Sequence, residues 1–154
     1  MLNHSYKKHI LFVIISSLFF PILALSNGDL SKQTPITISV NLSDKNNSLK
    51  FFPNNIQFET GKLYRLVLKN AGTGKHYFSS DKFSQSIFTR KVQILDSAGK
   101  TITEVKGHIR EVEIYPDQTA EWWFVPVKTG SFDDLKCVIP GHAEAGMVGK
   151  INIQ

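Results

Sequence analysis

The stretch 137–147, CVIPGHAEAGM, places a thiol, an imidazole and a thioether at equal spacing, at Cys137, His142 and Met147. Cys137 is the only cysteine in the chain, so a disulfide within the chain cannot explain it, and the one other methionine is Met1. Proline and glycine at 140–141 bend the segment between the thiol and the imidazole. Three side chains of the kinds that bind soft metal ions therefore fall in one short loop.

These donor types point to copper. A thiolate, an imidazole and a thioether together favour a copper ion that cycles between Cu(I) and Cu(II), and two His with one Cys and a distant axial Met make a blue-copper electron-transfer site. A second His must come from elsewhere, and after residue 26 the chain has only His76, His108 and His142. His76 follows the glycine-rich turn NAGTGK and opens the apolar stretch HYF, whereas His108 lies among charged residues. His76 is therefore the preferred fourth ligand.

Residues 1–26 have the three-part pattern of a secretory signal peptide. A polar lead with Lys7 and Lys8 precedes the apolar run 10–25, and Ala24-Leu25-Ser26 places small residues at the cleavage positions. The run is shorter than the ~20 residues that a membrane span needs. We expect cleavage before Asn27, which leaves one domain, 27–154, with no membrane span; an uncleaved N-terminal membrane tether is the alternative.

Export predicts a periplasmic protein, and it makes a single cysteine unusual, because cysteines in oxidising compartments generally pair. Cys137 is then either a metal ligand or a link between two chains. The chain has 18 Lys and Arg against 13 Asp and Glu, with no block of like charges, so nucleic-acid binding is not supported. We expect a monomer.

The rest of the chain alternates between extended segments and turns. Segment 36–42, ITISVNL, alternates apolar and polar residues, and 63–70, LYRLVLKN, places Tyr64, Leu66 and Leu68 on one apolar face. Helical spacing of apolar residues predicts one short helix within 81–91, and 96–100 reads as a hairpin turn. Short strands with frequent turns predict an all-β sandwich of about seven or eight strands in a single domain.

Three segments carry a resemblance to a known family. CVIPGHAEAGMVGKINI, the upstream WWFVPVKTGSFDDLKC and the element NAGTGKHYF closely resemble the cupredoxins, the small blue copper proteins. The resemblance implies a Greek-key β-sandwich with one type 1 copper, held by His76, Cys137 and His142 in the equatorial plane and by Met147 axially. It also implies single-electron transfer between redox partners such as cytochromes or copper oxidases, with His142 at the exit edge.

The sequence departs from the family at positions beside these ligands. In several cupredoxins an Asn after the first His bonds to a Ser or Thr after the Cys, and so ties two ligand loops together. Here Tyr77 and Val138 occupy those places, and Lys75 precedes the His. The surroundings of the site must therefore be built differently.

Two other functions compete with electron transfer. A copper-handling protein, for delivery, storage or tolerance, is the alternative, although its usual Met-rich or His-rich tracts are missing. An enzyme is not expected, because a trinuclear copper cluster needs paired His-x-His motifs and a dinuclear purple copper site needs two Cys. A zinc hydrolase would keep an open coordination position, which four protein ligands do not leave.

Overall fold

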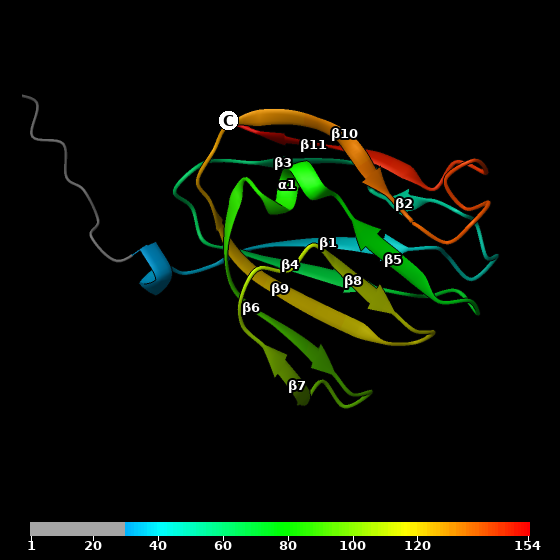
Figure 1. Ribbon diagram of the computed structural model, residues 1–154. Coiled ribbons are helices and arrows are strands. Elements are labelled where there is room, and N and C mark those ends of the chain that lie inside the picture. Colours follow the sequence, from blue (N-terminus) through cyan, green and yellow to red (C-terminus); the bar gives the residue numbers. More distant parts are fainter. Residues whose placement is uncertain (1–29) are drawn as a thin grey trace, which may run out of the picture.

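The computed structural model describes residues 30–154, which form two packed β-sheets (Figure 1). The predicted signal peptide lies outside the described residues. Across 30–154, no helix is both long enough and apolar enough to cross a membrane. The elements in chain order are η1 (Leu30–Lys32), β1 (Ile36–Leu42), β2 (Phe51–Phe52), β3 (Asn55–Phe58), β4 (Tyr64–Lys69), β5 (His76–Ser79), α1 (Asp81–Ser84), β6 (Ile87–Leu95), β7 (Thr101–Val105), β8 (Glu111–Ile114), β9 (Thr119–Pro126), β10 (Gly130–Lys136) and β11 (Val148–Ile153).

One sheet has the strand order β2-β1-β4-β9-β6-β7 and the other has the order β3-β11-β10-β5-β8. The pairs β1–β4 and β3–β11 are parallel, and the other pairs are antiparallel. This arrangement confirms the predicted all-β sandwich. The described residues form eleven strands rather than about seven or eight, because short segments such as β2 and β5 pair as strands of their own.

The alternation in the sequence decides which side chains enter the core. In β4, Tyr64, Leu66 and Leu68 are buried between the sheets, as predicted. The neighbours Trp122 and Trp123 of β9 serve opposite faces: Trp122 is buried in the core, while the ring of Trp123 lies beside cationic side chains on the outer face. Edge-to-face contacts between aromatic rings fill the space between the sheets.

The predicted helix within 81–91 is right in position but wrong in extent. Helix α1 spans only Asp81–Ser84, and the Ser80 hydroxyl caps it by accepting a hydrogen bond from the Phe83 N–H. From Ile87 the chain pairs with β9 as strand β6. The apolar spacing was misleading because Phe88, which it placed on a buried helical face, is 61% exposed.

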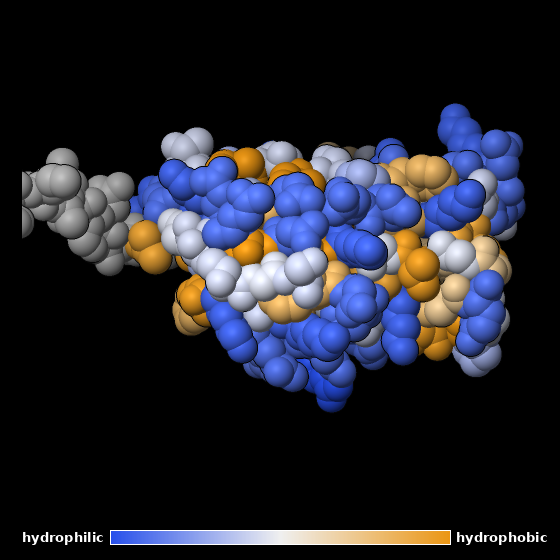
Figure 2. Space-filling model, turned by 90° about the horizontal axis from the view of Figure 1, so that it is seen from above, coloured by the Kyte–Doolittle hydropathy of each residue, from blue (hydrophilic) through white to orange (hydrophobic). Residues whose placement is uncertain are grey.

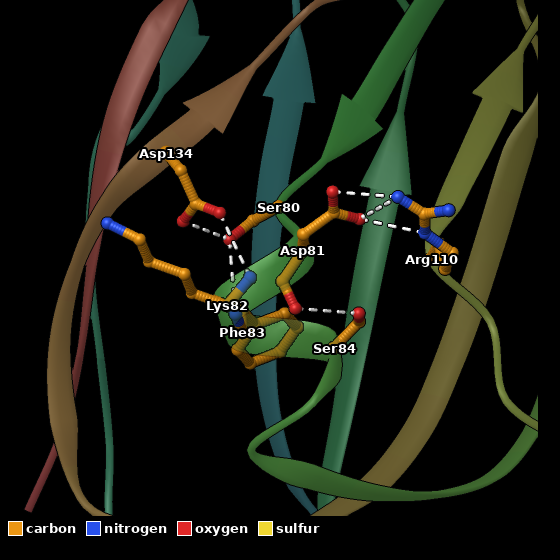
Figure 3. Close-up of polar contacts among 7 residues, drawn as sticks. All are labelled: Ser80, Asp81, Lys82, Phe83, Ser84, Arg110 and Asp134. Carbon is orange, nitrogen blue, oxygen red and sulfur yellow. Dashed lines mark hydrogen bonds and ion pairs between the residues drawn. The ribbon is translucent and has the colours of Figure 1, made fainter.

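Two adjacent carboxylates of β10 contact α1 and its cap, and Figure 3 shows the contacts of one of them, Asp134. Asp134 accepts hydrogen bonds from the Ser80 hydroxyl, at 2.6 Å, and from the Lys82 backbone N–H, at 2.9 Å. Asp133 pairs with the Lys82 ammonium group at 3.3 Å. Asp134 therefore has a structural role at the start of α1, whereas the ion pair of Asp133 is exposed to solvent.

Four loops meet at one end of the sandwich, on the right in Figure 1. They are 43–50, 70–75, 115–118 and 137–147, which follow β1, β4, β8 and β10. Hydrogen bonds join them: Thr73 N–H donates to the Asn47 side chain at 2.7 Å, and Asn70 N–H donates to the Gln118 carbonyl at 3.1 Å. This end brings together residues that are far apart in the sequence.

Candidate metal centre

Two neighbouring strands place the first two candidate ligands. His76 is the first residue of β5, and Cys137 directly follows the last residue of β10. These strands pair through Ser79 and Lys136, so the imidazole and the thiol project from adjacent positions at the end where the loops meet. Both side chains are almost fully buried, with 3% and 1% of their surface exposed.

The loop 137–147 is closed by hydrogen bonds within its own backbone. The Cys137 N–H donates to the Met147 carbonyl at 3.1 Å, and the Met147 N–H donates to the His142 carbonyl at 2.9 Å. Gly141 and Gly146 have φ values of +85° and +105°, which side chains larger than glycine rarely adopt. The glycines thus let the chain turn twice within the loop, which returns His142 to the side of Cys137.

The side chains converge at this point. Ligand atoms of His76, Cys137 and His142 all lie within 4.8 Å of one another. The Cys137 Sγ lies 3.4 Å from the His142 Nδ1, and the two imidazole ring centroids are 5.2 Å apart. His142 is half-buried, so this centre reaches the protein surface through one imidazole.

An unpaired polar atom supports a metal ion as the missing partner. The Nδ1 of His76 is buried and has no hydrogen-bond partner, a costly arrangement for a polar atom that nothing binds. Burial and, to a smaller extent, the nearby His142 lower the pKa of His76, which keeps its imidazole neutral and able to donate a lone pair. A thiol and two imidazoles are three of the four donors of a blue-copper site.

The remaining predicted residues have clear positions. Met147 is fully buried, and its backbone bonds to both Cys137 and His142. His108 is exposed on the segment between β7 and β8 and is not part of the group around Cys137. The structure thus gathers His76, Cys137 and His142 and leaves His108 outside.

Two contacts beside the site were not found by sequence reasoning. The Tyr77 N–H points at the Cys137 Sγ at 3.4 Å, and a backbone donor of this kind leaves no signal in the sequence. On the outer face of β5, Lys75 pairs with Glu113 of β8 at 2.7 Å, which lowers the pKa of that carboxyl. The second contact follows from the register of β5 and β8, which opposes Tyr77 to Glu113.

A search against family models gives no match. The copper-resistant cuproprotein CopI of Rubrivivax gelatinosus is 31% identical to this chain over 143 residues, which cover 82% of this chain and 71% of that protein.

Solved structures share the architecture at low sequence identity. Auracyanin B superposes with a TM-score of 0.52 at 17% identity and covers 79% of this chain and 91% of its own. A multicopper oxidase from Pediococcus acidilactici gives 0.57 at 18% identity and covers 97% of this chain but only 31% of the oxidase. A copper-containing nitrite reductase from Thermus scotoductus gives 0.54 at 15% identity, over 79% of this chain and 32% of the reductase. These likenesses concern the fold, since function depends on individual sites.

Proposed function

This chain belongs to the cupredoxin family of copper proteins, and we propose that it is a periplasmic type 1 copper protein that carries single electrons between redox partners. The proposed ligands are His76, Cys137 and His142 with axial Met147. The observation that carries the proposal is the buried His–Cys–His group with an unpaired His76 Nδ1. A copper ion bound there would supply a one-electron couple between Cu(I) and Cu(II).

The protein frame suits electron transfer because it holds the ligands still. His76 is fixed in the β5–β8 pairing, and the loop 137–147 is closed by its own hydrogen bonds. The Tyr77 N–H contributes a donor to the sulfur of Cys137, and such contacts tune the electronic properties of a metal centre. A site that moves little between oxidation states loses little energy to rearrangement when an electron passes.

The recess beside the thiol favours a carrier over an enzyme. It has a volume of ≈130 Å³ and is lined by residues of the Cys137 loop together with Lys136. Small-molecule sites commonly occupy ~300–1,000 Å³. A second recess, of ≈340 Å³, lies beside it and holds none of the proposed ligands; it is lined by Ser79, Asp81, Arg110, Glu111, Lys136 and Val138. We propose that the protein is not an enzyme. The match to the multicopper oxidase covers only 31% of the oxidase, which is a much longer chain.

We propose redox proteins, such as cytochromes or copper oxidases, as partners, with His142 as the contact point. Its half-buried imidazole connects the buried thiol with the surface. Apart from the exposed Glu144, the neighbouring loop residues are small or apolar, and at this end of the molecule apolar residues lie among hydrophilic ones (Figure 2). A surface of this kind permits brief contacts of the sort that electron-transfer proteins make.

Copper handling is the second candidate, and the relative named for copper resistance favours it. Both functions need the same ligands. They differ in whether the copper ion stays in the site or leaves it when the copper is reduced. We would cycle the copper-loaded protein repeatedly between reductant and oxidant in the presence of a Cu(I) chelator. Electron transfer predicts a reversible one-electron response with copper retained through every cycle. Copper appearing on the chelator after the first reduction would instead support delivery and overturn the carrier role.

A further inference from the structure

The loop before His76 is organised by one buried side chain. Asn70 follows β4 and has no exposed surface. A buried primary amide must satisfy two N–H donors and a carbonyl acceptor, or it destabilises the fold. The hydrogen-bond partners of the Asn70 amide therefore show which parts of the loop it holds in place.

All three groups of the amide are used. The Nδ2 group donates to the Gly74 carbonyl at 2.7 Å and to the Ile114 carbonyl at 2.9 Å, while Oδ1 accepts from the Gly72 N–H at 3.0 Å. One side chain thus spans the loop internally and joins it to the end of β8. The backbone of Asn70 is also bound, to residues 117 and 118.

These contacts surround the first proposed ligand. Ile114 is the direct antiparallel partner of His76, and Gly74 lies two residues before it. The residue after His76, Tyr77, donates its N–H to the sulfur of Cys137. A displacement of Gly74 or Ile114 would therefore shift both the His76 imidazole and the donor to the thiolate.

A second asparagine holds the same loop from outside. Asn47 accepts from the Thr73 N–H at 2.7 Å and from its hydroxyl at 3.0 Å. The loop packs so tightly here that a Cβ at Gly72 would lie 2.7 Å from the Ser43 Oγ. The loop is braced on both sides, and Asn70 is its only buried anchor among the contacts just described.

We propose that Asn70 is a positioning residue of the copper centre. It sets the His76 imidazole against Cys137 and His142 before any metal arrives, and it does so from the loop that precedes the ligand. The link between the ligand loops that several cupredoxins have is missing here, because Tyr77 and Val138 occupy its positions, and Asn70 fixes the loop before His76 without touching the loop of Cys137. The inference rests on the proposed function of the same site.

Asn70→Asp is the test variant, because it keeps the shape and the acceptor for Gly72 but turns a carboxylate oxygen toward two carbonyls. We expect about 10- to 100-fold weaker copper retention against a chelator. We also expect an altered Cu(II) visible and EPR spectrum, measured well below the melting temperature. The control Asn152→Asp changes a half-buried amide of β11 outside the group around Cys137, and Ile153→Val lowers stability from the opposite end of the sandwich. Both controls should keep the wild-type spectrum.

A wild-type protein without a blue band would refute the proposed function and not this inference. The proposal for Asn70 would be overturned if the wild type is blue and Asn70→Asp loses only stability, with its spectrum and copper affinity unchanged. If that variant does not fold, hydrogen exchange of the wild-type Asn70 side-chain amide decides. Slow exchange already in the copper-free protein supports the proposal, and protection that appears only with copper contradicts it.

Discussion

The two loops that position the proposed ligands are built in opposite ways. Loop 137–147 carries three of them within eleven residues and closes on itself through backbone hydrogen bonds. Loop 70–75 carries none, and it positions His76 through side chains and through β8, whose Ile114 is 44 residues away from Asn70. The half of the centre in loop 137–147 is formed by one short segment and depends on glycine conformations. The half at His76 is formed by distant segments and depends on buried hydrogen bonds.

Removing one proposed imidazole ligand from each half of the centre should have the largest effect and tests the comparison most strongly. We expect His76→Gly and His142→Gly both to lose the intense blue absorption, since each removes a proposed equatorial ligand. Added imidazole should restore it in His142→Gly, where the side chain is half-buried at the surface. It should fail in His76→Gly, where only 3% of the side chain is exposed. Equal rescue of both variants would contradict this assignment of a buried and a surface ligand.

A glycine substitution in each loop sharpens the comparison. Gly141 has φ +85°, so Gly141→Ala should cost about 1–2 kcal/mol in the free energy of unfolding. Gly74 has ordinary backbone angles and no atom within 4 Å of an added Cβ, so Gly74→Ala should change it by less than about 0.5 kcal/mol. Denaturant titration of the copper-free proteins measures both. Equal losses would show that the two loops do not differ in their dependence on glycine.

The outer brace of loop 70–75 should have a smaller effect. Asn47→Ala removes both hydrogen bonds to Thr73, each worth about 0.5–1.5 kcal/mol and here at the lower end because the residues are exposed. We expect faster hydrogen exchange at the Thr73 amide with the blue spectrum retained. Asn46→Ala, at the exposed neighbouring position, is the matched control. Loss of the spectrum in Asn47→Ala alone would mean that the outer brace, rather than Asn70, positions His76.

The smallest expected effect is a dependence on acid in loop 43–50. Hydrogen bonds from Ser48 lower the pKa of Asp44 below its ordinary value. A lowered pKa in the folded state means that this contribution is fully present above about pH 4 and is lost as the pH falls through the lowered value. The protection of the Thr73 amide, corrected for the intrinsic pH dependence of exchange, should then fall in step with the titration of Asp44, followed by NMR. If the protection of the Thr73 amide is the same in Asp44→Asn as in the wild type, the charge of Asp44 in loop 43–50 does not affect loop 70–75.

The local half of the centre could be predicted from the sequence because spacing alone places Cys137, His142 and Met147 in one loop. The alternating segments 36–42 and 63–70 likewise predicted strands, and the structure contains them as β1 and as β4 at Tyr64–Lys69. His76 was chosen over His108 from its place after a glycine-rich turn, and the geometry groups it with Cys137.

The other half depends on pairings between distant segments. Nothing in NAGTGK indicates that Asn70 reaches Ile114, because that contact follows from the register of β5 with β8. The helical spacing around Ile87 failed for the same reason: pairing with β9 overrode a local preference. Short strands such as β5 depend on their neighbours and are easily merged or missed in a sequence.

The most direct test of the copper centre is the visible absorption spectrum after one equivalent of Cu(II) is added to the protein and to Cys137→Ser. We predict an intense blue band in the wild type that is absent from the variant, because the band requires a bond between the thiolate and copper. A colourless wild type, or a band of equal strength in Cys137→Ser, would contradict the proposed centre.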